Sequence, residues 1–377
     1  MRSVKTILVH LALIVGSTLL TVGVLEGVVR IVWPQKLIVL RPDLWIPDDE
    51  VGWRNAPNLD TKVNTGERDV RLLTDARGHR VPARPGEEAR HTILAVGDSF
   101  LAALQVEYEQ TMTALLEVDL SEELGETVRI VNAGVGAWNL NHYLLETQSE
   151  LAREAYDLVL VFIYVNNDVG PRQAVEARAS ILHRFRAPRR FTRLEWVDAL
   201  LRPFNEFMER RSHLYVLVKN RLKYLRMRLG LSAYYMPWPC LVAQADSPHW
   251  TATADLGAEI HEAGAAHRIP VLFVLMPGLL QIDQAEVERY ASSFNIDPAE
   301  IDVGQPKRLL TTLFEARGLA VVNPTDALST AHTSGVTDLY GYIDTHLGVN
   351  GHRTVAAFLK PLLVEALRQE PSSPFSP

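Results

Sequence analysis

The sequence predicts an α/β protein: a three-layer α/β/α domain around a mostly parallel five-stranded sheet, preceded by one N-terminal transmembrane helix. Short continuous apolar runs alternate with helical segments, which is typical of a parallel sheet covered on both faces. The chain has 377 residues, 47 % of them hydrophobic and 22 % charged. These ordinary globular values exclude a disordered, collagen-like or coiled-coil chain.

The net charge and the cysteine content exclude several classes of function. Lys and Arg number 38 against 45 Asp and Glu, a net charge of −7, which argues against a globally basic nucleic-acid binder. Cys240 is the only cysteine, so an internal disulfide framework and a cysteine-rich zinc site are excluded. Any chemistry must therefore come from oxygen and nitrogen side chains.

The N-terminus carries an apolar run over residues 6–25 without a formal charge. A helix of that length spans a hydrocarbon core of roughly 30 Å. Arg2 and Lys5 precede the run and no A-x-A-like cleavage site closes it, so we expect residues 1–30 to be a retained signal anchor. The basic N-terminal flank favours a body outside the cytoplasm, although basic residues also follow the run. A buried core helix and a cleaved leader are the alternatives.

The expected sheet begins after a connector with short strands over residues 31–91. The main α/β domain is predicted over 92–370, with a last helix over 351–368 and a disordered tail over 371–377. A helical stretch is expected over 101–124. Five apolar runs predict the strands: 92–96, 128–134, 156–165, 269–277 and 319–324.

A basic helical insert is predicted over residues 178–250. Between 178 and 228 there are 14 Arg and Lys residues and 4 Asp and Glu residues. Such a segment could cap a site for an anionic substrate or lie against anionic lipid headgroups. The alternative is a pair of solvated amphipathic helices.

Polar residues follow the first three apolar runs, where ligands bind in open parallel sheets. Ser99, in Gly-Asp-Ser-Phe, stands at a strand-to-helix turn that exposes a hydroxyl. Small residues over 132–139 allow backbone N–H groups to approach a ligand oxygen, and Asn167 offers an amide donor. Each pattern alone also fits an ordinary turn or helix cap.

A candidate acid–base pair lies near the C-terminus. His346 can take a proton from Ser99, and Asp344 can hold the other ring nitrogen. A metal site recruiting His332 or His352 is the alternative, but HExxH-type and cysteine ligands are missing. We therefore expect neither metal nor cofactor.

In combination and in this order, these motifs resemble the SGNH hydrolases, also called the GDSL-like lipase/esterase superfamily. The resemblance implies that Ser99 is the nucleophile and that Asp344 and His346 complete the triad. It implies an oxyanion hole made by the Ser99 and Ala137 backbone N–H groups and the Asn167 side chain. Ala137 stands where the family normally has glycine.

Two further features of this sequence resemble a membrane-associated branch of the family. That branch includes proteins that acetylate exopolysaccharides. One is the short Asp-x-His spacing of Asp344 and His346. The other is the upstream pair of segments Gly-Trp-Arg at 52–54 and Arg-Gly-His-Arg at 77–80.

The resemblance implies a membrane-anchored serine esterase or O-acyltransferase acting on an O-acylated glycan or another cell-envelope ester. Ser99 would carry the acyl group, and water or a second hydroxyl would receive it. A catalytically degenerate domain serving as envelope scaffold or polysaccharide-binding protein is the alternative. No nucleic-acid partner is expected, and the sequence does not predict an oligomeric state.

Overall fold

The structure is a computed structural model. It describes residues 2–35, 37, 44–65, 68–83, 88–170, 201, 204–205, 207–209, 211–228, 238–294, 296–341 and 345–368. The chain divides into two units. One comprises Met1–Val39 and Pro188–Ser232, and the other comprises Leu40–Ala187 and Ala233–Pro377.

The first unit contains two described helices, α1 (Arg2–Val32) and α7 (His213–Arg228). The Glu26 carboxylate of α1 accepts hydrogen bonds from the Ser212 hydroxyl at 2.7 Å and from the backbone N–H of Leu214 at 2.9 Å. Glu26 therefore satisfies backbone donors at the N-terminus of α7, where a negative charge is favourable. Residues 178–200 of the predicted insert lie outside the described residues.

Within α1, the segment Val9–Val32 is long and apolar enough to cross a membrane, with a mean hydropathy of 2.0. None of its most apolar window is buried against protein. Exposed apolar side chains argue against the alternative of a buried core helix.

The second unit is built on a five-stranded sheet whose neighbouring strands are all parallel. The strand order is β6-β5-β7-β8-β9: β6 lies on one side of the first strand, β5, and β7, β8 and β9 follow on its other side. This confirms the predicted fold class. The strands are β5 (His91–Gly97), β6 (Val128–Gly134), β7 (Leu158–Tyr164), β8 (Val271–Met276) and β9 (Ala320–Val322).

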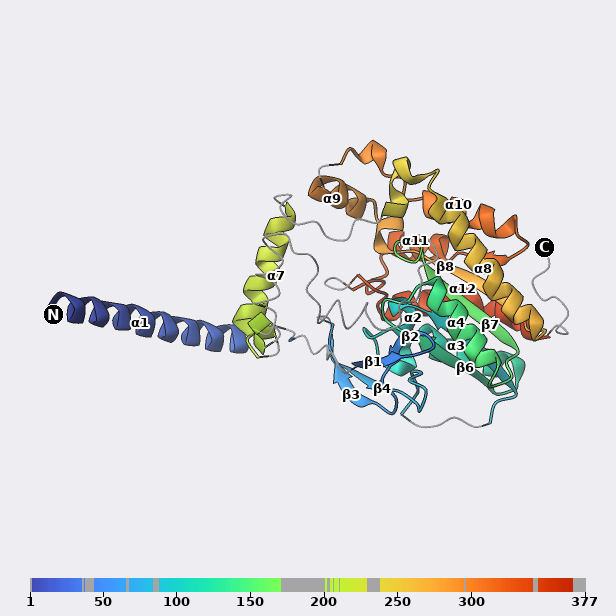
Figure 1. The fold of residues 1–377 in the computed structure, drawn as a ribbon, viewed down its shortest axis with the longest axis horizontal. Coiled ribbons are helices and arrows are strands. Elements are labelled where there is room, and N and C mark those ends of the chain that lie inside the picture. The colour runs from blue at the N-terminus through green and yellow to red at the C-terminus, as the bar shows by residue number, and fades with distance from the viewer. Residues whose placement is uncertain are drawn as a thin grey trace. The chain divides into compact units, whose positions relative to one another are not determined.

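Helices cover both faces of this sheet, as Figure 1 shows. On one face α4 (Leu140–Leu151), α8 (Pro248–Ala266) and α10 (Gln305–Glu315) form one hydrophobic core with the strands. The other face is covered by α2 (Ser99–Ala102), α3 (Met112–Leu124), α11 (Thr325–Thr333) and α12 (Val349–Arg368). A further helix is α9 (Gln284–Phe294).

The helix predicted over 101–124 is wrong in its continuity. The chain forms α2, then a left-handed turn at Ala103 with φ of 53°, a short 3₁₀ helix at Tyr108–Gln110, and finally α3. Thr111 caps α3 by accepting from the backbone N–H of Ala114. A helical apolar pattern cannot reveal this break, because the residues on both sides of it are buried.

The connector forms two antiparallel hairpins. The first pairs β1 (Trp45–Asp48) with β2 (Gly52–Asn55), and the second pairs β3 (Asp60–Val63) with β4 (Val70–Leu73). At the other end, α8 begins at Pro248 and buries Trp250, so this part of the predicted insert belongs to the core of the second unit.

A buried charge cluster joins the connector to α4. His79 Nε2 lies 3.1 Å from Glu146 and 3.9 Å from Glu150, and all three side chains are almost fully buried. Arg77 pairs with Glu150 at 2.8 Å, and Arg54 lies 3.6 Å from Glu146. Burial alone would lower the pKa of His79, but its hydrogen bonds and the two glutamates raise this pKa to about 9.

This raised pKa predicts a pH-dependent stability. The stabilising imidazolium is fully present below the unfolded pKa of 6.5 and is lost as the pH rises through about 9. We expect the free energy of unfolding to fall by roughly 3 kcal/mol across this window, measured by urea unfolding at stepped pH. His79→Gln should abolish that decline; the same decline in both proteins would contradict the assignment.

Candidate active site

Ser99 lies two residues beyond the end of β5, at the carboxyl edge of the sheet. Asp98 precedes it and caps α2, because its side chain accepts a 2.8 Å hydrogen bond from the backbone N–H of Phe100. The strand ends at Gly97, and the chain turns at once into the helix. Ser99 is therefore held at a sharp strand-to-helix turn.

The hydroxyl of Ser99 meets the imidazole of His346. Ser99 Oγ lies 2.7 Å from His346 Nε2 and 3.4 Å from Asp98 Oδ2. The shorter distance favours donation of the hydroxyl proton to His346, with Nε2 as the acceptor. Residues 247 positions apart in sequence are thus in hydrogen-bond contact.

His346 is fixed by a short loop pairing before α12. Tyr340 pairs with Leu347 as an antiparallel bridge, and the backbone N–H of Gly341 donates to the His346 carbonyl at 2.8 Å. The Tyr340 hydroxyl donates to the Pro277 carbonyl at 2.8 Å, just beyond β8. The Phe100 ring lies 4.9 Å from the His346 ring, between centroids.

Asn167 reaches the same edge from β7. Its Nδ2 donates to Asp98 Oδ2 at 3.4 Å, so the buried Asp98 carboxylate joins the serine turn to the asparagine. The side chain of Asn167 is otherwise exposed. An amide here can donate to a ligand oxygen near Ser99.

Two fully buried carboxyls stand behind these groups. Burial raises the pKa of Asp98, although the hydrogen bond from Phe100 and the His346 charge lower it in part. Burial and the neighbouring Asp98 charge raise the pKa of Asp168 well above its usual value. The Tyr143 hydroxyl donates to Asp168 at 2.7 Å. The two carboxyls therefore oppose each other's ionisation.

The loop after β6, which contains Ala137, is held by the β1–β2 hairpin. Asn55 Nδ2 donates to the Gly134 carbonyl at 3.0 Å, and Trp53 Nε1 donates to the Gly136 carbonyl at 3.2 Å. Trp138 Nε1 donates back to the Trp53 carbonyl at 2.8 Å. The hairpin thus binds the loop at three points.

The contact from Trp53 sets the direction in which the backbone N–H of Ala137 points. A peptide unit is planar and trans, so its carbonyl and its N–H point in opposite directions. Because Trp53 holds the Gly136 carbonyl, the N–H of Ala137 in the same peptide unit points away from the hairpin. Ala137 is exposed and adopts the left-handed region with φ of 65°.

Arg80 holds the other end of α2. Its buried guanidinium donates to the carbonyls of Ala102 at 2.8 Å and Val106 at 2.7 Å, and also to that of Ala103. Burial lowers the pKa of Arg80 to about 10, which leaves the group charged at neutral pH. The sequence segment Arg-Gly-His-Arg therefore serves both the buried charge cluster and the helix that begins with Ser99.

The structure describes four of the five predicted site residues. Ser99, His346 and Asn167 are brought together, and Ala137 lies at the same edge of the sheet; Asp344 lies outside the described residues. Sequence reasoning missed Asp98 as the link between the turn and Asn167. The sequence signal for this role is that Asp98 directly precedes Ser99. An aspartate at that position can cap the helix and also contact a residue that follows β7.

His352, weighed as a metal ligand in the sequence, lies elsewhere in the core. Its Nδ1 accepts from the backbone N–H of Met112 at 3.3 Å, and burial lowers its pKa to about 3. His79, Glu146 and Glu150 have ligand atoms within 4.8 Å of one another. The positive charges of Arg54 and Arg77 lie beside these carboxylates and oppose the binding of a divalent cation, whereas a singly charged imidazolium is already paired there.

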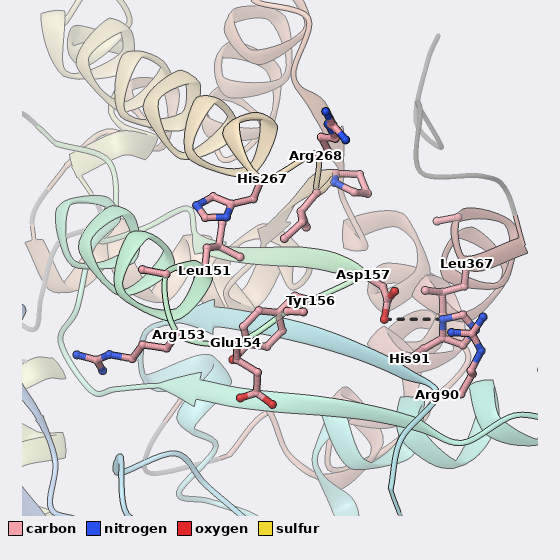
Figure 2. Close-up of a pocket in the computed structure, with 15 residues that line it drawn as sticks. Arg90, His91, Leu151, Arg153, Glu154, Tyr156, Asp157, His267, Arg268 and Leu367 are labelled. Atoms are coloured by element: carbon pink, nitrogen blue, oxygen red, sulfur yellow. Dashed lines mark ion pairs between the residues drawn. The ribbon is translucent and has the colours of Figure 1, made fainter.

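A pocket of about 600 Å³ lies at the opposite edge of the sheet, where β5, β7 and β8 begin. Figure 2 shows that its arginines Arg90, Arg153 and Arg268 point in different directions. His91 lies 3.8 Å from Asp157 across the pocket. These cations do not converge on one position, unlike the groups around Ser99.

No family model and no curated protein matches the chain. Among solved structures, a lipase/acylhydrolase from Enterococcus faecalis matches with 15 % identity over 74 % of this chain and 98 % of its own, at a TM-score of 0.38. A catalytic mutant of an acetylxylan esterase from Geobacillus stearothermophilus matches with 12 % identity over 75 % and 99 %, at 0.40.

A lipolytic G-D-S-L family member from Veillonella parvula matches with 11 % identity over 71 % of this chain and 96 % of its own, at a TM-score of 0.37. The chain resembles the GDSL, or SGNH, lipolytic proteins.

Trp53→Phe tests whether the hairpin orders the loop. The variant keeps an aromatic ring but removes the donor to the Gly136 carbonyl, so we expect a loss of about 1 kcal/mol in unfolding free energy. We also expect faster hydrogen exchange at residues 134–139, measured by mass spectrometry.

Trp250→Phe is the matched control, because Trp250 Nε1 donates to the Gln244 carbonyl at 2.7 Å. It should lose similar stability while exchange at residues 134–139 stays unchanged. Unchanged exchange there in Trp53→Phe would contradict the role of the hairpin.

Proposed function

We propose that this chain is a membrane-anchored serine esterase or O-acyltransferase of the SGNH type. Residues 1–30 would anchor it, 31–91 would connect, and 92–370 would form the catalytic domain. The observation that carries the proposal is the 2.7 Å contact between Ser99 Oγ and His346 Nε2 at the carboxyl edge of a parallel sheet.

In the proposed reaction, Ser99 Oγ attacks an ester carbonyl while His346 Nε2 takes its proton. The developing oxyanion is stabilised by the backbone N–H groups of Ser99 and Ala137 and by Asn167 Nδ2. His346 then protonates the departing alkoxide, which leaves an acyl-Ser99 ester. Asp344 would orient the imidazole, as the family resemblance implies.

The second half of the reaction regenerates the enzyme. Water or a second hydroxyl loses its proton to His346 and attacks the acyl group, and Ser99 recovers its hydroxyl proton. Water as acceptor makes the protein an esterase, and a sugar hydroxyl makes it an O-acyltransferase. None of these steps uses a metal or cofactor.

The proposed substrate is an O-acylated glycan or another cell-envelope ester. An apolar α1 supports a membrane anchor, and the basic flank before it supports a catalytic domain outside the cytoplasm. An anchored enzyme on that side would meet envelope polymers. One of the similar solved structures is described as an acetylxylan esterase.

Ser99→Ala and His346→Ala should each lower kcat on an aryl acetate by about 10⁴-fold or more. Because the two groups act as a unit, the double variant should lose no more than the worse single variant. A fluorophosphonate probe should label the wild type and not Ser99→Ala.

His332→Ala is the matched control, since His332 is a part-exposed histidine that lies 3.8 Å from Asp283 and has no described contact with Ser99. It should keep full activity and labelling. Absence of labelling in folded wild-type protein would overturn the enzymatic proposal and favour a scaffold or polysaccharide-binding protein.

The anchor has a separate test. Wild-type protein should stay in the membrane pellet after carbonate washing, whereas Leu13→Arg with Leu20→Arg should release it, since each central arginine opposes insertion by about 2.5–3.5 kcal/mol. Recovery of intact wild type without detergent would contradict the anchor.

The side of the membrane can be read with a thiol probe. Cys240 is fully buried, so a cysteine placed at the exposed residue Ala83 gives a selective label. An impermeant maleimide should label Ala83→Cys in sealed cells without lysis. Labelling that requires lysis would place the domain in the cytoplasm.

A further inference from the structure

A cavity of about 190 Å³ adjoins the proposed oxyanion donor. Asn167 lies in its wall, as do Asn139 and Asn141 at the start of α4. Asn139 follows Ala137 by two residues, so the cavity starts beside both loops of the proposed oxyanion hole. A substrate whose ester reaches Ser99 would extend into it. Asp168, Trp238 and His249 also line it.

The polar groups in this wall have unused hydrogen-bonding capacity. Asn139 Oδ1 accepts from the backbone N–H and from Nδ2 of Asn141. No described hydrogen bond uses Asn139 Nδ2 or Asn141 Oδ1, which leaves a donor and an acceptor. Asp168 Oδ1 is buried and has no hydrogen-bond partner among the described residues. Amide donors and acceptors in a cavity wall, with a carboxyl oxygen beside them, suit a ligand with several hydroxyl groups.

Trp238 adds an aromatic surface to the same wall. Its ring is partly exposed and packs edge to face with His249 at 5.3 Å and against Trp250 at 5.7 Å, between centroids. These contacts hold the indole in place. An indole face packs well against the C–H face of a sugar ring, while the amides bind its hydroxyls. An acyl chain would instead need an apolar wall.

We propose that this cavity is a subsite for one sugar ring of an O-acylated oligosaccharide, recognised by Trp238 and the amides of Asn139 and Asn141. The proposal rests on the proposed function, because Asn167 serves both the oxyanion and the cavity wall. It adds the position of the sugar and the residues that select a polyhydroxylated substrate over a lipid ester.

Binding can be measured without turnover. The full chain carrying Ser99→Ala, in detergent micelles, is titrated calorimetrically with acetylated xylotetraose and with its deacetylated form. Adding Trp238→Ala or Asn141→Ala should weaken the affinity about tenfold. Trp238→Phe keeps an aromatic face and should retain most of the affinity. The matched amide control is Asn58→Gly, since Asn58 is exposed with φ of 52°, where glycine is tolerated.

The outcomes separate this proposal from the proposed function. Absence of binding to both forms of xylotetraose would overturn the subsite. So would equal affinities of the variants Trp238→Ala, Asn141→Ala and Asn58→Gly, measured on proteins whose melting temperatures are unchanged. Tighter binding of a decanoyl ester than of both sugars would assign the cavity to an acyl chain. If the sugar binds but wild type is not labelled by the fluorophosphonate probe, the subsite stands and the esterase proposal fails.

Discussion

The close approach of α2 to the end of the sheet is the constraint on which the site depends. A Cβ built on Gly134 would lie 2.4 Å from the backbone nitrogen of Ala102, and one on Gly97 would lie 2.9 Å from Leu101 Cβ. These two glycines are register partners at the ends of β5 and β6. Only with both small can the helix that begins at Ser99 cross the strand ends within reach of His346 and Asn167.

The strands and the group around Ser99 were predictable because their signals are local or lie in motifs. The run at 128–134 is β6 as predicted, since continuous apolar residues identify a strand buried on both faces. The connector was predicted only as short strand-like pieces, because hairpin pairing such as Asp60 with Leu73 depends on distant partners. The contact of Ser99 with His346 was predicted from two motifs far apart in the chain, the Gly-Asp-Ser turn and the Asp-x-His pair, and from the family resemblance that they carry.

Long-range polar contacts account for what the sequence could not predict. Arg80 and His79 are adjacent, yet Arg80 binds carbonyls after α2 while His79 joins Glu146 on α4. Nothing in a four-residue segment shows which of several carboxylates each cation will meet. Because an unpaired buried charge is strongly destabilising, each cation must find a partner, and together they fix the connector to the domain.

The left-handed conformation of Ala137 also depends on long-range contacts, here those between its loop and the β1–β2 hairpin. A residue with a Cβ in this region costs roughly 1–2 kcal/mol relative to a right-handed conformation. The loop around it gains three hydrogen bonds with the hairpin, each contributing about 0.5–1.5 kcal/mol. Their sum is large enough to hold alanine where the family normally has glycine. The proposed oxyanion donor at residue 137 therefore does not need glycine, provided that Trp53 and Asn55 fix the loop before it.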